Sequence, residues 1–271
     1  MVNIAIYIIL FIIGTLCGSF LSLAIYRIPI KQDITHKRSY CPSCNHRLGF
    51  WDLIPIFSYI GLKGKCRYCH NKIGNRYFLL EFATGILFVL YALSIKINFI
   101  NINEYKIASL ILGYIYIVIV ILIAGIDKNK KYIDKSVLVF GILISMIYMA
   151  YLYFRMPIKF NLQFSRYVIY ISVIIILCLI DIIIMRKKAN KNYCVQILMF
   201  YIFMCIFSNE LTMICIAISL LIASLLYYLI LKIKQITNKT VKKEIKINIH
   251  IGYLLGIINI FGLIITNLFF I

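Results

Sequence analysis

The stretch CPSCNHRLGFWDLIPIFSYIGLKGKCRYC, residues 41–69, places two pairs of cysteines in a polar loop of an otherwise hydrophobic chain. Two residues separate the cysteines within each pair, and 21 residues separate Cys44 from Cys66. A two-residue gap allows both thiolates of a pair to reach the same tetrahedral metal ion. The spacing therefore predicts a four-cysteine zinc ribbon whose ligands are Cys41, Cys44, Cys66 and Cys69.

The zinc ion is expected to have a structural role. Four thiolates fill a tetrahedral shell and leave no open position for water or substrate. Binding would fold a loop that is too small to hold a core of its own. His46 and His70 lie near the cysteines and are alternative ligands by residue type. Because four thiolates are present, we expect both imidazoles to stay outside the coordination shell.

The rest of the chain is apolar enough to lie in a bilayer. Its residues are 63% hydrophobic and its mean hydropathy is +0.96, which is outside the usual range of globular domains. Runs of about 20 apolar residues predict an all-α polytopic membrane protein with about eight spanning helices. The predicted helices cover residues 3–25, 77–99, 107–126, 136–154, 165–185, 194–207, 211–231 and 251–271.

The basic residues predict the orientation of these helices. Of the 29 Lys and Arg residues, 24 fall in the alternate loops 27–76, 127–135, 186–193 and 232–248. The segments on the opposite side hold only Lys96, Lys106, Arg155, Lys159 and Arg166. Lys and Arg are retained on the cytoplasmic side of membrane proteins, so the first set of loops is predicted to be cytoplasmic and both termini external.

The same distribution accounts for the net charge of +20. Basic loops beside anionic headgroups make membrane lipid the expected partner, and nucleic-acid binding is not expected. A cytoplasmic loop also faces a reducing compartment, where paired thiols more often bind metal than form disulfides.

Two further stretches carry a family resemblance, namely GSFLSLAIYRIP at residues 18–29 and FWDLIPIFSYIGLKGKCRYCHNKIGNRYFLLEFATGILF at residues 50–88. With both cysteine pairs, they make residues 14–90 resemble the N-terminal region of bacterial type IV prepilin peptidases. These inner-membrane enzymes remove the leader peptides of pilin precursors and methylate the new N-terminus. The resemblance implies a methyltransferase-like region at residues 1–90 and a six-helix aspartic peptidase-like region at residues 91–271.

The family carries two catalytic aspartates at the cytoplasmic membrane face. The resemblance assigns the first to Asp127, in GIDKNKKYID, although Asp134 follows Ile133 where the family usually has proline. The second belongs to a Gly-x-Gly-Asp motif, and here the corresponding stretch KNYCVQ, residues 191–196, has Cys194 in its place. A neutral thiol is a weak donor and replaces neither carboxylate of an aspartic dyad well, so peptidase activity is in doubt.

Asp181 is a possible substitute for the missing aspartate. It lies within the apolar run LCLIDIIIMRKK, where an ionisable side chain is a candidate for a functional site. Its distance from the basic end of the run predicts a membrane depth similar to that of Asp127. The alternative is that its carboxylate reaches toward Arg186 or Lys188.

Glu81, Arg76 and Tyr77 are the candidates for the methyltransferase-like region. The resemblance implies a role for Glu81 there, although packing against a polar group of another segment is an alternative. It also implies that Arg76 and Tyr77 contact S-adenosylmethionine or the pilin. The sequence contains no glycine-rich nucleotide loop, so this cofactor rests on the resemblance alone.

The sequence thus predicts a prepilin peptidase and N-methyltransferase that acts on prepilin or pseudopilin precursors. One alternative is a protease-deficient member that keeps N-methylation or serves as a non-catalytic pilin-assembly factor. Another is a zinc-bearing membrane scaffold. The substitution at Cys194 favours the protease-deficient member, and the match across residues 18–88 disfavours the scaffold.

Overall fold

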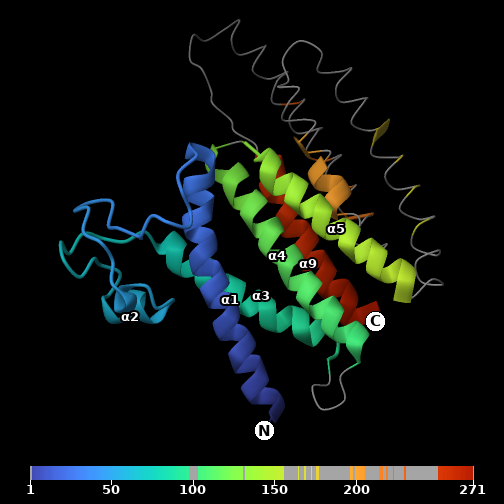
Figure 1. The fold of residues 1–271 in the computed structure, drawn as a ribbon, viewed down its shortest axis with the longest axis horizontal. Coiled ribbons are helices and arrows are strands. Elements are labelled where there is room, and N and C mark those ends of the chain that lie inside the picture. Colours follow the sequence, from blue (N-terminus) through green and yellow to red (C-terminus); the bar gives the residue numbers. More distant parts are fainter. Residues whose placement is uncertain are drawn as a thin grey trace, which may run out of the picture. The chain divides into compact units, whose positions relative to one another are not determined.

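The structure is a computed structural model that describes residues 2–97, 103–130, 132–155 and 250–270, with isolated residues and short stretches between 164 and 229. Within these residues the chain is helical, and its elements are α1 (Val2–Arg27), η1 (Ile28–Ile30), η2 (Phe50–Asp52), α2 (Phe57–Gly61), α3 (Asn75–Ser94), α4 (Glu104–Lys130), α5 (Lys135–Arg155) and α9 (Ile251–Phe270) (Figure 1).

Five of the described helices are long and apolar enough to cross a membrane, which confirms an all-α membrane protein. They are α1, α3, α4, α5 and α9. The predicted helices at 165–185 and 211–231 fall mainly outside the described residues, as do Asp181, Cys194 and most of the stretch around Cys194. Within the predicted helix at 194–207, residues 196, 197 and 199–204 are described, and they are helical. The count of eight spans therefore stays a prediction.

The observed helix ends differ from the predicted ones by a few residues. The second predicted helix, 77–99, ends at Ser94, and Lys96 beyond it adopts a left-handed backbone conformation with φ of 49°. The third, 107–126, extends from Glu104 to Lys130. Acidic residues near a helix N-terminus and basic residues near its C-terminus are favourable, so charged residues at both ends prolong this helix beyond its apolar part.

The chain divides into two compact units, residues 1–118 and residues 119–270. The predicted methyltransferase-like region, residues 1–90, and peptidase-like region, residues 91–271, divide the chain by function and not by compactness. This functional division stays a prediction.

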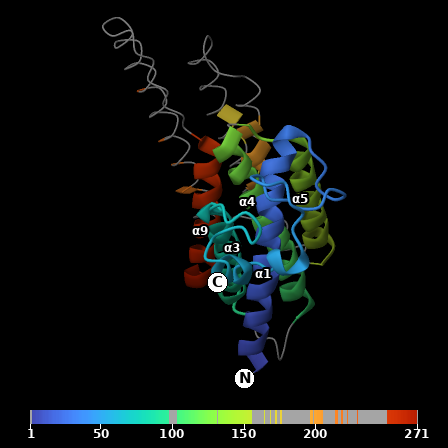
Figure 2. The same ribbon diagram turned by 90° about the vertical axis from the view of Figure 1, so that its left-hand side faces the viewer.

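In the N-terminal unit, α1 packs closely on α3 (Figure 2). A Cβ atom added at Gly18 would lie 2.7 Å from the Cα of Glu81, and one added at Gly14 would lie 2.8 Å from the Cα of Gly85. Helices that cross in lipid approach each other through such small residues four positions apart. Gly18 thereby holds the backbone of Glu81 directly against α1.

In the second unit, α5 begins at an aspartate that caps its N-terminus. The Oδ1 of Asp134 accepts hydrogen bonds from the N–H groups of Ser136 at 2.8 Å and Val137 at 3.3 Å. The hydroxyl of Tyr132 donates to its other oxygen at 3.1 Å. Asp134 occupies the position where the resemblance leads us to expect proline, and aspartate is among the most favourable capping residues.

Candidate metal centre and adjoining sites

The two cysteine pairs come together as the spacing predicts. One potential ligand atom from each of Cys41, Cys44, Cys66 and Cys69 lies within 4.8 Å of all the others. The Sγ atoms of Cys41 and Cys69, from different pairs, are 3.9 Å apart. A tetrahedral ion with Zn–S bonds of about 2.3 Å would separate its sulfurs by roughly 3.8 Å. The four thiols therefore fit a divalent ion such as zinc.

The backbone builds the two halves of this cluster in the same way. The N–H of Cys41 donates to the carbonyl of His46, and the N–H of Cys66 donates to the carbonyl of Asn71, five residues on in each case. The residue after each pair, Asn45 or His70, has φ of 57°. This left-handed residue turns the chain tightly enough to direct both thiols of a pair inward.

The thiols affect one another's ionisation. Burial acts to raise the pKa of Cys41, but hydrogen bonds from the Cys44 and Ser43 N–H groups and from neighbouring thiols lower it to about 7. The Asn71 N–H acts to lower the pKa of Cys69, whereas burial and the three other thiols raise it to about 11. The protein alone thus disfavours four thiolates side by side, and a bound divalent cation would supply the compensating charge.

Among the described residues, neither His46 nor His70 belongs to the metal-binding group. The ring of His46 instead lies 3.6 Å, centroid to centroid, from the ring of Tyr68. This contact joins the first cysteine pair to the second through side chains outside the four-cysteine group.

Asp52 holds the loop between the pairs, a role that the sequence did not indicate. Its carboxylate accepts hydrogen bonds from the Nε of Arg67 at 2.7 Å, the Tyr68 hydroxyl at 3.1 Å and the Gly49 N–H at 3.0 Å. Burial acts to raise the pKa of Asp52, but these donors lower it overall. The carboxylate thereby fixes η2 against the second cysteine pair.

Arg27 organises the other end of the loop. Only 4% of this residue is exposed, and its guanidinium donates to the backbone carbonyls of Asp33, Lys37 and Arg38 at 2.8–3.2 Å. A buried arginine must find acceptors for its fixed set of N–H donors. The arginine of the matched YRIP sequence therefore folds the first part of the polar loop back onto the end of α1.

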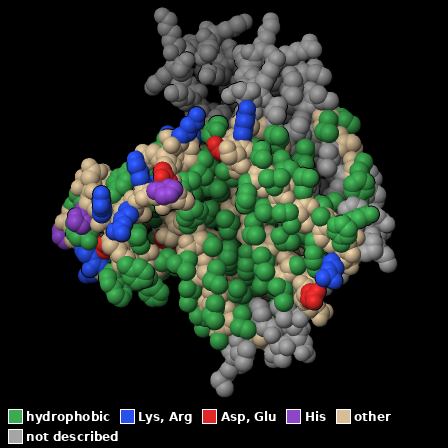
Figure 3. Space-filling model, viewed as in Figure 1, with side chains coloured by type: hydrophobic (Ala, Val, Ile, Leu, Met, Phe, Trp, Pro, Cys, Tyr) green, Lys and Arg blue, Asp and Glu red, His purple; other side chains and the backbone are tan. Residues whose placement is uncertain are grey.

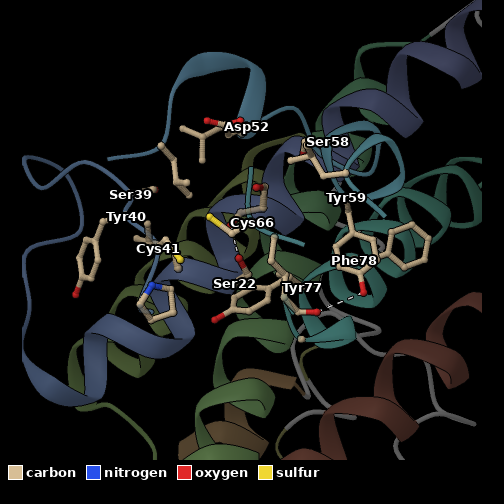
Figure 4. A pocket seen from close by; sticks show the side chains of 18 of the residues that line it. Ser22, Ser39, Tyr40, Cys41, Asp52, Ser58, Tyr59, Cys66, Tyr77 and Phe78 are labelled. Atoms are coloured by element: carbon tan, nitrogen blue, oxygen red, sulfur yellow. Dashed lines mark hydrogen bonds between the residues drawn. The ribbon is translucent and has the colours of Figure 1, made fainter. Parts of the chain in front are cut away.

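A cavity of about 620 Å³ lies between the metal cluster and the helices α1 and α3. Figure 4 shows Cys41 and Cys66 beside it, with Ser22 and Tyr77 also among its lining residues. Arg76 and Glu81 line it as well, so all three predicted methyltransferase-region residues share this cavity. Arg76 and Tyr77 contact each other, with Nη2 of Arg76 3.3 Å from the Tyr77 hydroxyl. The volume is within the range of small-molecule sites.

Glu81 also has a structural partner. Its Oε2 accepts a hydrogen bond from the N–H of Ile56 at 2.9 Å, and the residue is 9% exposed. Ile56 precedes α2 and has φ of 63°, so no helix of its own satisfies this N–H. The packing alternative for Glu81 is thus observed, and the same carboxylate borders the cavity.

Asp127 is fully buried, with 0% of its surface exposed, near the end of α4. Its Oδ2 accepts a hydrogen bond from the N–H of Tyr253 at 3.0 Å, in the first turn of α9. The Nδ1 of His250 lies 2.7 Å from the backbone carbonyl of Asp127, and since a carbonyl only accepts, this nitrogen carries the proton. The carboxylate therefore caps the N-terminus of α9.

Two neighbours complete the surroundings of Asp127. A Cβ atom at Gly252 would lie 3.2 Å from its Oδ2, so the glycine leaves room for the carboxylate. The ammonium of Lys128 lies 4.4 Å from the ring centroid of Tyr253 and 3.1 Å from its hydroxyl. The Asp127 carboxylate therefore lies at the N-terminus of α9, where a helix favours negatively charged groups.

Comparison with known proteins finds relatives of the N-terminal region, which contains the cysteine cluster and the cavity. Residues 12–95 match the bacterial peptidase A24 N-terminal domain. A prepilin leader peptidase/N-methyltransferase of Myxococcus xanthus is 44% identical over 79 residues, which cover 29% of this chain and 24% of that protein. In this region, the chain is similar to the prepilin peptidase A24 family.

Two other relatives, with the same name, extend the comparison. The Vibrio cholerae protein is 40% identical over 99 residues, 33% of this chain and 39% of its own length. The Bacillus subtilis protein is 33% identical over 132 residues, 49% of this chain and 50% of its own length. The chain thus spans half or less of these relatives. No solved structure matches it.

Proposed function

We propose that this chain processes the N-termini of prepilin-like precursors at the cytoplasmic face of a bacterial inner membrane, and that N-methylation is its better-supported activity. The observation that carries the proposal is the cavity beside the cysteine cluster, which Arg76, Tyr77 and Glu81 line together. Residues from α1, the metal loop and α3 all contribute to it. The region that builds the cavity is also the region that matches the family domain.

The zinc ion would act on this cavity indirectly. Cys41 and Cys66 belong to both the metal-binding group and the cavity wall. A bound ion would fix the positions of these residues. It would also fix the intervening loop, because Asp52 accepts hydrogen bonds from Arg67 and Tyr68, which lie between Cys66 and Cys69. The proposed role of zinc is therefore to keep the wall of the cavity folded, since a shell of four thiolates leaves no position for a reactant.

The lining of the cavity suits a sulfonium methyl donor such as S-adenosylmethionine. The Arg76 guanidinium can pair with a carboxylate, and the Tyr77 ring offers a face to a base or to a cation. When bound, such a donor would supply a methyl group to a free amine. The Glu81 carboxyl group lies at the wall, where it would accept a hydrogen bond from the α-amino group of a processed precursor.

Proteolysis is the less supported half of the family activity in this chain. Asp127 would be the ionised carboxylate of a dyad, since an N–H donor and a helix N-terminus stabilise its charge. Its partner would have to be a protonated carboxyl group, and Cys194 does not supply one. Asp181 is the candidate replacement. We therefore propose slow or absent cleavage unless Asp181 supplies the second carboxyl group.

The two activities can be tested separately by co-expression. One precursor keeps its leader peptide, and a second version begins at the mature N-terminus after removal of an N-terminal fusion. Mass spectrometry follows leader loss in the first and methylation in both. The variants are Arg76→Ala with Tyr77→Phe for the cavity and Asp127→Asn for the peptidase site. Asp134→Asn, an acid that caps α5, is the matched control.

We expect methylation of the mature form by the wild type and the Asp127→Asn variant, with loss in the cavity variant at unchanged zinc content. Leader removal by the wild type that disappears in both Asp127→Asn and Asp181→Asn would instead support a working dyad. If neither precursor is changed by the folded, zinc-loaded protein, both enzymatic interpretations are wrong and the assembly-factor alternative gains support.

A further inference from the structure

The polar loop exposes a set of large apolar side chains outside its metal cluster. Phe50 is 77% exposed, Trp51 71%, Phe57 75% and Ile60 60%. These four residues, in η2 and α2, form what we call the aromatic face. Water-exposed clusters of this kind are uncommon on a loop and mark contact with another apolar phase or partner.

Aromatic contacts join this face to the start of a spanning helix. The ring of Tyr59 in α2 stacks on that of Phe78 in α3 with centroids 5.3 Å apart, and Phe78 stacks on Phe82 at 6.0 Å. The Tyr59 hydroxyl also donates to the Oδ1 of Asn75, the first residue of α3, at 2.7 Å. Helix α2 therefore lies alongside the first turns of a membrane-spanning helix.

The hydrogen bond from Ile56 to Glu81 indicates how deep the loop reaches. Glu81 is six residues beyond the start of α3, which corresponds to about 9 Å along the helix axis. The Ile56 N–H that it accepts therefore lies at a similar depth. Backbone that leaves regular structure at membrane depth needs an internal partner. The buried glutamate provides that partner for the irregular segment before α2.

The surroundings of the aromatic face carry positive charge. Lys63, Lys65, Arg67 and Lys72 are exposed on the same loop. Figure 3 shows Lys, Arg and His side chains over the upper and outer part of the loop, whereas hydrophobic side chains gather at its lower edge, where Figure 1 places α2. Basic residues beside a row of exposed aromatic residues are typical of segments that lie in the headgroup region of a bilayer with anionic lipids.

We propose that residues 50–61 form an interfacial segment that lies in the membrane surface beside α3, with the aromatic face at the boundary between lipid headgroups and acyl chains. Tyr59 and Glu81 attach this segment to α3, and the exposed lysines and arginines stay with the headgroups. The segment would then hold the metal loop, and the cavity behind it, against the membrane. This inference depends on the spanning helices and is independent of catalysis.

Trp51 is the only tryptophan of the chain, so its fluorescence reports directly on the aromatic face. The wild-type protein is reconstituted into phosphatidylcholine–phosphatidylglycerol vesicles whose acyl chains are brominated near the headgroup or near the chain end. We expect roughly twofold loss of emission with the shallow bromines, less with the deep ones, and weak quenching by acrylamide, because interfacial aromatic residues lie only a few ångströms below the headgroups.

The control moves the tryptophan to another part of the same loop. In the double variant Trp51→Phe with His36→Trp, the reporter replaces a side chain that is 87% exposed, and we expect it to respond to acrylamide and not to brominated lipid. Equal lipid quenching of both reporters would overturn the proposal, as would a Trp51 that only acrylamide quenches. Protection of Trp51 that requires an added prepilin-like hydrophobic peptide would also overturn it and would assign the face to protein docking.

Discussion

Polar groups gather at the ends of apolar helices in two places, the metal loop of the N-terminal unit and the Asp127 site of the second unit. The two places differ in what binds these polar groups. In the loop, four thiols converge within 4.8 Å of one another, an arrangement that a cation completes. At Asp127, the carboxylate receives the N–H of Tyr253, so another helix of the same chain satisfies it. The four thiols are arranged so that they could hold a metal ion. The Asp127 carboxylate, in contrast, accepts a backbone hydrogen bond.

Because of this difference, the matched cysteines and the matched Asp127 contribute to the structure in different ways. The thiols of the four cysteines converge on one another, an arrangement that suits a metal ion. Asp127 contributes to the packing of α9 whether or not it takes part in proteolysis. A match to a catalytic position is therefore weaker support for catalysis at Asp127 than four matched thiols are for metal binding.

The largest expected effect comes from breaking the metal cluster. We expect Cys41→Ser with Cys44→Ser to abolish zinc binding, from about one ion per chain, and to open residues 31–74 to proteolysis. The binding energy of a structural zinc site, roughly 10 kcal/mol or more, is also its folding energy. Metal analysis and limited proteolysis of the purified protein measure both changes.

Cys17, in α1 and outside the cluster, provides the matched control. Its change to serine should leave zinc content and proteolysis as in the wild type. Zinc retained by the double variant, or a stoichiometric disulfide in place of metal in the wild type, would show that the thiols do not form a metal site.

The next prediction concerns the close crossing of α1 and α3, the two helices beside the cavity. Gly18→Ala would place a Cβ atom 2.7 Å from the backbone of Glu81, so α1 and α3 must move apart. Overpacking of this kind costs about 1–3 kcal/mol, which should lower the temperature of unfolding in detergent. Gly61→Ala is the control, because a Cβ atom there meets nothing within 4 Å. Equal unfolding temperatures for the two variants would contradict the close crossing.

Substitutions of Asp127, in the second unit, test whether its carboxylate caps α9. Asp127→Ala leaves the Tyr253 N–H without its acceptor and should cost about 1–3 kcal/mol. Asp127→Asn keeps an oxygen that can accept the Tyr253 N–H and replaces the other oxygen with an NH2 group, so its cost should be smaller than that of the alanine variant. Hydrogen exchange over residues 250–257 should accelerate more in the alanine variant. If both variants exchange like the wild type, the carboxylate does not cap α9.

The smallest effect is expected at the start of α5. Asp134→Ala removes a cap at a position that is partly exposed, and loss of such a cap costs about 1 kcal/mol. Exchange of the Ser136 and Val137 amides should increase while that of α9 stays unchanged. Faster exchange in α9 would show that the two acids act as one site, which would remove the distinction between them.

Several features of the fold were predictable because they depend on short stretches of sequence. The five described spans follow from apolar runs that are long enough to cross a bilayer. The two-residue spacing within each cysteine pair predicted a metal cluster because each pair closes a turn within a few residues. The ends of α3 and α4 were less predictable, since the left-handed Lys96 and the terminal charges of α4 decide them and hydropathy does not report either.

The roles of Asp52 and Arg27 could not be predicted from hydropathy or motif spacing. In the sequence, Asp52 resembles a solvated acid between apolar residues, and its bonds to Arg67 and Tyr68 exist only because the loop turns back on itself. Arg27 is one of ten basic residues in the loop 27–76 on which the predicted topology depends. Its buried position follows from the carbonyl groups that the folded loop presents to it.

The sequence by itself determined that the chain is a membrane protein, that four cysteines have the spacing of a metal site, and which family its N-terminal region resembles. Composition and local spacing carry that information, because bilayer thickness and tetrahedral coordination impose fixed lengths on the chain. Only the tertiary structure decided that Glu81 receives the N–H of Ile56, 25 residues away, and that Asp127 receives that of Tyr253, 126 residues away. Such pairs depend on how helices cross, and helix crossing is set by packing between segments far apart in the sequence.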